Sequence, residues 1–436
     1  MRSVFGFVAL ALLAACAPRS EPFRTAPLPK DPGYLSAVPA GDTAFDNEDL
    51  AHLFVQLTHG LETGEYRQNL QRFEGPVNVG MTGPGSTDYQ KFLRRFLAEI
   101  RKQAGVDISV GAPPHDLLIQ MVPGEELLPR TTAQCFVIFA QPTWEEFKAN
   151  PSRYEPLVVD ASGPQQKIGI MIPDTIEPFK VRECLLEEIP QALGPANDLY
   201  GLANTIFNDD DAHTWPTKLD YLMLEVLYDE RLESGLSQAE TLTLAQAVLD
   251  DVNPEGVGAP KLPPVQQDAF LDWRGSLHRL SVDGEPIVLQ NVRKAAAEAR
   301  RKAPFSAYDC TGATILAIVT GNATTRDADK LLEEAIKTCK RAHGIEDVRV
   351  AQLRLIKALR HLGGERYRRA REQAQAVLPV FLAHGLEDEI ADAKITIVRA
   401  SAGLRDPNWR NQLPDATAWS AFVFGDDHTV TETLRE

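Results

Sequence analysis

The chain has 436 residues, enough for two or three domains, and its hydrophobic content of 44% supports buried cores. Its formal net charge of −16 argues against a nucleic-acid partner, because phosphate binding needs a positively charged surface. Beyond the N-terminal residues, no segment is apolar over the roughly 20 residues that a membrane-spanning helix needs.

The N-terminus has the order of a secretory signal. Arg2 is positively charged, Val4–Leu13 is almost wholly apolar, and two small alanines follow. The segment Leu13–Cys16 resembles a bacterial lipobox, in which a diacylglyceryl group is joined to the cysteine sulfur. We therefore expect residues 1–15 to be a lipoprotein signal peptide and Cys16 to be lipidated. An ordinary signal with a chance cysteine is the alternative.

The residues after Cys16 indicate which membrane holds the anchor. Ala17 stands where an aspartate would resemble inner-membrane retention, so we expect attachment to the outer membrane, facing the periplasm. Six prolines between residues 17 and 45 predict an extended tether over 16–45. A second stretch rich in proline and glycine, 253–264, predicts a linker and the main domain boundary.

Between the two breaks, residues 46–252 show a mixed pattern of helices and strands, which predicts an α+β domain. Short apolar runs predict strands of one sheet at Val77–Val79, Ile108–Val110, Leu117–Val122, Cys135–Phe139 and Ile168–Ile172. Helical spacing predicts helices at Asp49–His59, Thr87–Gln103, Phe179–Leu193, Leu219–Tyr228 and Ala239–Val252. Thr87 and Gln90 have capping-box spacing, and Thr217 is a second expected helix cap.

Residues 265–436 are almost entirely helical in pattern. Four helices are predicted at Arg326–His343, Val348–Leu362, Arg366–His384 and Glu387–Ala402, and glycine follows the first three. Helix pairs recur about every 40 residues, which is typical of stacked helical hairpins. Tetratricopeptide-like repeats are the nearest known kind, and a plain helical bundle is the alternative.

Four cysteines remain after Cys16, and an even number in an oxidising compartment permits disulfides. We expect the pairs Cys135–Cys184 and Cys310–Cys339, because each pair stays within one predicted domain. Free buried thiols are the alternative.

The most informative segment is Glu183–Asp198, compared with the zinc-protease pattern H-E-x-x-H-x-x-G-x-x-H. Glu188 takes the place of the general-base glutamate and Gly194 the place of the glycine. The three histidine positions are occupied by Glu187, Gln191 and Asn197. Glu187 and Gln191 lie four residues apart, opposite the apolar stripe of their helix, so we expect both to face a cleft.

Downstream residues extend this resemblance to the metzincin branch of zinc proteases. Asn204–Asn208 stands where metzincins have a methionine turn, and the helix ending at Tyr228 resembles their closing helix. The passage 184–236 also resembles a proteobacterial lipoprotein family, domain of unknown function 2927, through its E-E-x-x-Q-x-L-G core, its Ile-Phe-Asn-Asp turn and the Leu-Tyr-Asp-x-Arg segment ending at Arg231. The resemblance implies a degenerate zincin-like fold and no defined reaction.

No cofactor and no metal are expected at these positions, because zinc prefers histidine nitrogen and cysteine sulfur to amide oxygens. A hard-cation site made by Glu187, Gln191, Asn197 and Asp198 is an alternative. A second acidic segment, Asp209–Asp211 followed by His213, is read as a solvated turn.

Three functions follow from these observations. The preferred hypothesis is a membrane-anchored, non-catalytic module that binds a peptide or protein. The second is a hydrolase of envelope peptides or glycans with Glu188 as its base. The third is a structural envelope protein that acts through its helical domain.

Overall fold

The computed structural model describes residues 41, 43–61, 66–127, 134–139, 142–149, 167–199, 202, 204–208, 212–262, 289–321 and 326–425. The predicted signal peptide, Cys16 and nearly all of the tether lie outside these ranges. Within them, no helix combines the length and the apolar character that crossing a membrane requires.

The first part of the chain is built on one five-stranded mixed sheet with the strand order β2-β1-β3-β5-β4. Its strands are β1 (Val77–Thr82), β2 (Ile108–Val110), β3 (Leu117–Val122), β4 (Phe136–Phe139) and β5 (Ile168–Pro173). Neighbouring strands are parallel except β4, which pairs antiparallel with β5 at one edge. The five predicted strands are therefore confirmed, and they belong to a single sheet.

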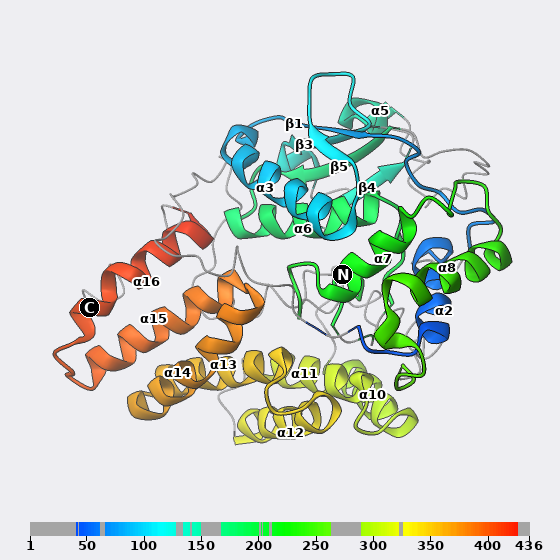
Figure 1. The fold of residues 1–436 in the computed structure, drawn as a ribbon. Coiled ribbons are helices and arrows are strands. Elements are labelled where there is room, and N and C mark those ends of the chain that lie inside the picture. Colours follow the sequence, from blue (N-terminus) through cyan, green and yellow to red (C-terminus); the bar gives the residue numbers. More distant parts are fainter. Residues whose placement is uncertain are drawn as a thin grey trace.

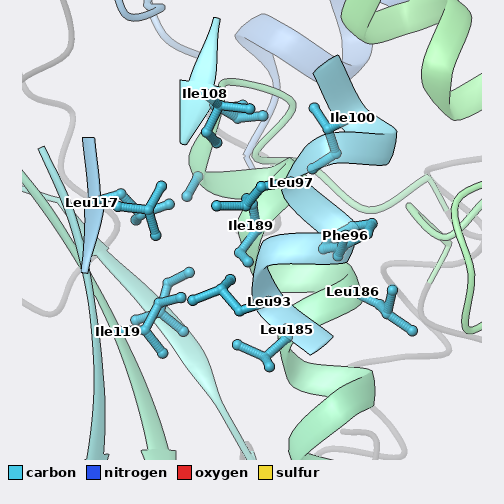
Figure 2. Packing of buried hydrophobic residues seen from close by; sticks show 14 of the residues in the cluster. Leu93, Phe96, Leu97, Ile100, Ile108, Leu117, Ile119, Leu185, Leu186 and Ile189 are labelled. Atoms are coloured by element: carbon cyan, nitrogen blue, oxygen red, sulfur yellow. The ribbon is translucent and has the colours of Figure 1, made fainter. Parts of the chain in front are cut away.

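Two long helices, α3 (Ser86–Ala104) and α6 (Pro178–Ala192), pack against the same face of this sheet (Figure 1). Figure 2 shows Leu93 and Leu97 of α3 and Leu185 and Ile189 of α6 directed towards the strands. The short helices α4 (Gly124–Leu127) and α5 (Trp144–Ala149) contribute to a smaller apolar cluster with residues of β4 and β5. The sheet is therefore covered on both faces.

The predicted capping box at the start of α3 is wrong. The N-cap residue is Gly85, with φ of 74°, and no side chain caps the helix. Thr87 lies inside the first turn, and the Gln90 amide donates instead to the Met81 carbonyl at 3.3 Å. Only glycine adopts this left-handed conformation without strain, so the turn geometry placed the helix start one residue earlier than the pattern predicted.

A second core joins helices from the two ends of the first unit: α2 (Asn47–His59), α7 (Lys218–Leu227) and α8 (Gln238–Val252). The chain after α8 returns to α2. A short 3₁₀ helix, η3 (Pro254–Gly256), follows Asn253, whose carbonyl accepts from the Asn47 amide at 3.1 Å. The Leu262 amide donates to Asp49 at 2.8 Å. The described part of the predicted linker is thus fixed against the first unit.

The rest of the described chain is all-helical. It contains α10 (Leu289–Lys302), α11 (Ala307–Gly321), α12 (Arg326–His343), α13 (Val348–Gly363), α14 (Tyr367–His384), α15 (Glu387–Gly403) and α16 (Trp409–Phe424). Consecutive helices pack as antiparallel hairpins, and α13 also contacts α15. Gly344, Gly364 and Gly385 follow α12, α13 and α14 as predicted. The whole chain is α+β.

Both predicted disulfides are present. Cys135–Cys184 joins the residue before β4 to α6, and Cys310–Cys339 joins α11 to α12. All four cysteines are buried, so each bridge lies inside the core of its own unit.

Candidate functional site

The candidate site lies on the C-terminal half of α6 and in the turn that follows. Glu187, Glu188 and Gln191 are only 4%, 5% and 8% exposed. Glu187 and Gln191, which were expected to face a cleft, are therefore nearly closed off from solvent. The helix is buried on all sides: the sheet and α3 cover its apolar stripe, and the segments after it cover the polar side.

The amide groups of Gln191 and Asn197, at two positions compared with the zinc-protease histidines, donate internal hydrogen bonds. The Gln191 amide donates to Asp198 at 3.2 Å, and the Asn197 amide donates to the Gln56 carbonyl in α2 at 2.9 Å. Asn197 and Asp198 are themselves buried, at 1% and 9% exposure. The structure thus brings Gln191 and Asp198 together and turns Asn197 away, towards the end of α2.

Gly194 is held by close packing. Its φ of +148° is one that other residues rarely adopt. A Cβ atom at this position would lie 2.6 Å from Leu227 Cδ2 and 3.1 Å from the Gln71 carbonyl oxygen. The Tyr228 hydroxyl donates to the neighbouring Leu193 carbonyl at 2.9 Å. The glycine therefore lets the chain after α6 pass close to α7.

The turn 204–208 is organised by one buried carboxylate. Asp220 accepts from the Thr205 hydroxyl, from the Ile206 amide at 3.1 Å and from the Thr217 amide at 2.7 Å. The Thr217 hydroxyl accepts in return from the Asp220 amide at 3.3 Å, so the predicted helix cap at Thr217 is confirmed as a full capping box. Burial raises the pKa of Asp220 to about 6, although these hydrogen bonds lower it.

The chemistry of these residues does not fit zinc. Among the histidine, cysteine, aspartate and glutamate side chains in the described ranges, no group of three is arranged to hold a metal ion. Neutral amide oxygens are weak zinc ligands, and the two amides here point to different partners. The arrangement can position α6 and the following turn, and it offers no ready ligand set.

Sequence reasoning missed how the N-terminal half of α6 is anchored. The Arg182 guanidinium donates to Glu387 of α15 at 2.7 Å through Nε and to the Phe422 carbonyl of α16 at 3.2 Å. Phe179 packs edge-on against Phe424, with ring centroids 5.7 Å apart. The signal in the sequence was Arg182 itself, because the residues one helical turn before and after it are apolar. Helix α6, which carries the candidate site, therefore packs against both units.

His213 was also misjudged. The predicted solvated turn is wrong at this residue, because His213 is 6% exposed and its ring lies 5.2 Å from that of His384 at the end of α14. Asp209–Asp211 lie outside the described residues. The loop that follows them is part of the contact between the two units.

Comparison with known proteins relates the first unit to one family. Residues 47–247 match the family described as protein of unknown function (DUF2927). No curated protein and no solved structure matches the chain. The match begins with α2, includes the sheet and the α6 segment, and ends within α8. The first unit is therefore similar to DUF2927 over most of its length.

Proposed function

We propose that the chain is a lipid-anchored envelope protein whose first unit is a degenerate zincin-like module that binds a peptide or protein and does not hydrolyse it. One observation carries the non-catalytic part of this proposal. Gln191 and Asn197, at two of the three former histidine positions, use their amides to hold Asp198 and α2. These bonds use the amide nitrogens and fix both side chains in place, and the amide oxygens that would face a metal are weak zinc ligands.

The order of elements supports a zincin-like origin. Helix α6, which carries the motif, directly follows strand β5 of the mixed sheet and packs against that sheet. One edge of the sheet is the antiparallel strand β4. The turn at the methionine-turn position is buried in the core formed with α7, where Ile206 and Phe207 are 2% and 0% exposed. The turn therefore contributes to the core. This is the role that we expect for the segment in a domain without its zinc ligands.

The proposed anchor rests on the sequence Leu13–Cys16. One acyl chain binds a membrane reversibly, and several chains anchor stably at about 0.8 kcal/mol per buried CH₂. Labelling with radioactive palmitate in a bacterial host, followed by membrane fractionation, tests this part. Label that depends on Cys16 supports the anchor, and a Cys16→Ser variant that stays labelled contradicts it.

The helical unit suits the binding role. Stacked helical hairpins present an extended surface to a partner, and here they also brace α6 through Arg182. In the proposed arrangement the first unit supplies the rigid body and the hairpins supply additional surface.

Hydrolysis of envelope peptides by the wild-type chain, compared with Glu188→Gln, tests the absence of catalysis. We expect equal and background rates from both proteins. Turnover by the wild type that disappears in a stably folded Glu188→Gln variant would establish the hydrolase instead. Thermal unfolding of both proteins is the control, because Glu188 is buried and its replacement can affect stability.

A further inference from the structure

Two histidines from distant parts of the sequence, His213 and His384, meet where the two units touch, and a third, His343, interacts with the same Arg349 and Asp347. His213 comes from the loop 212–215 of the first unit, His343 ends α12, and His384 ends α14. The rings of His213 and His384 are 5.2 Å apart and tilted by 50°. Each of the three rings has one buried nitrogen without a hydrogen-bond partner: Nε2 of His213, Nε2 of His343 and Nδ1 of His384.

Among the residues that the structure describes, the charged groups next to these histidines are Asp347, before α13, and Arg349, in its first turn. Asp347 accepts from the Arg349 guanidinium at 3.1 Å. With the imidazoles neutral, the charges of this pair balance. Each proton that a ring takes up places another positive charge beside Arg349.

Burial and the nearby Arg349 lower the pKa of all three histidines. The pKa of His213 falls well below its usual 6.5, that of His343 falls to about 4, and that of His384 falls as well. Asp347 acts in the opposite direction on His343 and His384 and does not outweigh burial. The docked arrangement therefore favours neutral rings.

The loop that carries His213 connects the two units. Its Ala212 belongs to the apolar cluster made with α13–α16. Its Trp215 packs against Phe92 and Phe96 of α3, with ring centroids 5.9 Å and 6.2 Å apart. Protonation of His213 therefore affects a loop that packs against the helical unit on one side and against α3 on the other.

We propose that His213 and His384 form an acid-sensitive latch, which holds the loop 212–215 against α13 and the end of α14 at neutral pH and releases it in acid. This proposal stands apart from the function of the first unit. It concerns how firmly the helical unit holds the first unit, and it applies whether or not α6 is catalytic.

The direction and the steepness of the pH dependence of docking follow from proton linkage. A histidine with a lowered pKa in the docked state binds its proton only after release, so docking is complete above pH 6.5 and weakens below it. For each such histidine, the ratio of docked to released chain falls about tenfold per pH unit, until the docked-state pKa is reached. If two such histidines are released together, the ratio of docked to released chain falls about 100-fold per pH unit.

Hydrogen exchange of the full chain between about pH 7 and pH 5, corrected for the intrinsic pH dependence, tests the latch. We expect exchange in 212–217 and at the end of α14 to accelerate steeply in acid. A His213→Gln/His384→Gln variant should lose most of this acceleration, and His52→Gln, at an exposed site on α2, should keep it. Wild-type exchange that does not change with pH, or a double variant that responds as steeply, would overturn the proposal.

A second measurement covers the case in which the double variant is already released at neutral pH. Histidine NMR titration of the wild type, with the two rings assigned through the single variants His213→Gln and His384→Gln, should show both rings protonating below the ordinary pKa of about 6.5, in the same pH interval as the acceleration of exchange. Protonation of both assigned rings at about 6.5 would overturn the latch by itself.

Discussion

The Arg182–Glu387 pair should be among the most sensitive positions for docking of the two units. Its side chains are 4% and 9% exposed, so solvent screens their attraction little. Arg182 also donates to the Phe422 carbonyl and lies over the Phe422 ring, with Cζ 3.9 Å from the ring centroid. Removing one member of a buried pair leaves the other charge without compensation, at a cost of about 3–5 kcal/mol.

We expect Arg182→Ala to lower the free energy of unfolding by about this amount. The assay is urea denaturation followed by circular dichroism, with hydrogen exchange in α6 to show which unit loosens, because a two-unit chain need not unfold in one step. The matched control is Lys261→Ala. Lys261 pairs with Asp46 and Glu48 while its side chain is 60% exposed, and such surface pairs contribute about 1 kcal/mol or less.

A double variant separates charge from packing. Arg182→Met combined with Glu387→Leu removes both charges and keeps much of the apolar volume, so its stability should lie within about 1–2 kcal/mol of the wild type. An Arg182→Ala cost no larger than that of Lys261→Ala would refute the inference that this buried pair anchors α6.

Three further changes test the site and its support. Gly194→Ala should cost about 1–3 kcal/mol, because the new Cβ meets Leu227 and the backbone is strained; thermal unfolding at wild-type temperature would contradict this. Replacing Cys135 and Cys184 together by alanine should cost about 4 kcal/mol, as expected for a 49-residue separation, and equal denaturation midpoints would show otherwise. Asp220→Ala should cost about 2–4 kcal/mol by leaving buried donors in the turn 204–208 unpaired, and a loss no larger than that of an exposed-site variant would exclude this role.

The regular elements were predictable because their patterns are local. Alternating or continuous apolar runs gave all five strands, and 3.6-residue spacing with glycine stops gave α12–α15 within one or two residues of their ends. The disulfide pairs were predictable because each lies within one compact unit. For the helices and strands, the nearest neighbours in sequence decide the structure.

Apart from the cap of α3, which the local turn at Gly85 decides, the misjudged features depend on contacts with other segments. The polar side of α6 was expected to face a cleft because a helix pattern shows only that two faces differ, and the turn after α6 and α2 cover that side. The predicted linker folds back on α2 because Asn47 and Asp49 supply partners some 200 residues away. His213 was read as solvated because its neighbours in sequence are acidic, whereas its neighbours in space are Arg349 of α13 and His384 of α14.

The metal content of the purified chain tests the central claim most directly. Elemental analysis of the soluble body after Cys16, prepared without chelators, should find zinc and other transition metals far below one ion per chain. The same result is expected for Glu187→Ala and Gln191→Ala. One zinc per chain that is lost in either variant would show that the α6 segment still holds a metal, and would contradict a module that has given up its ligands.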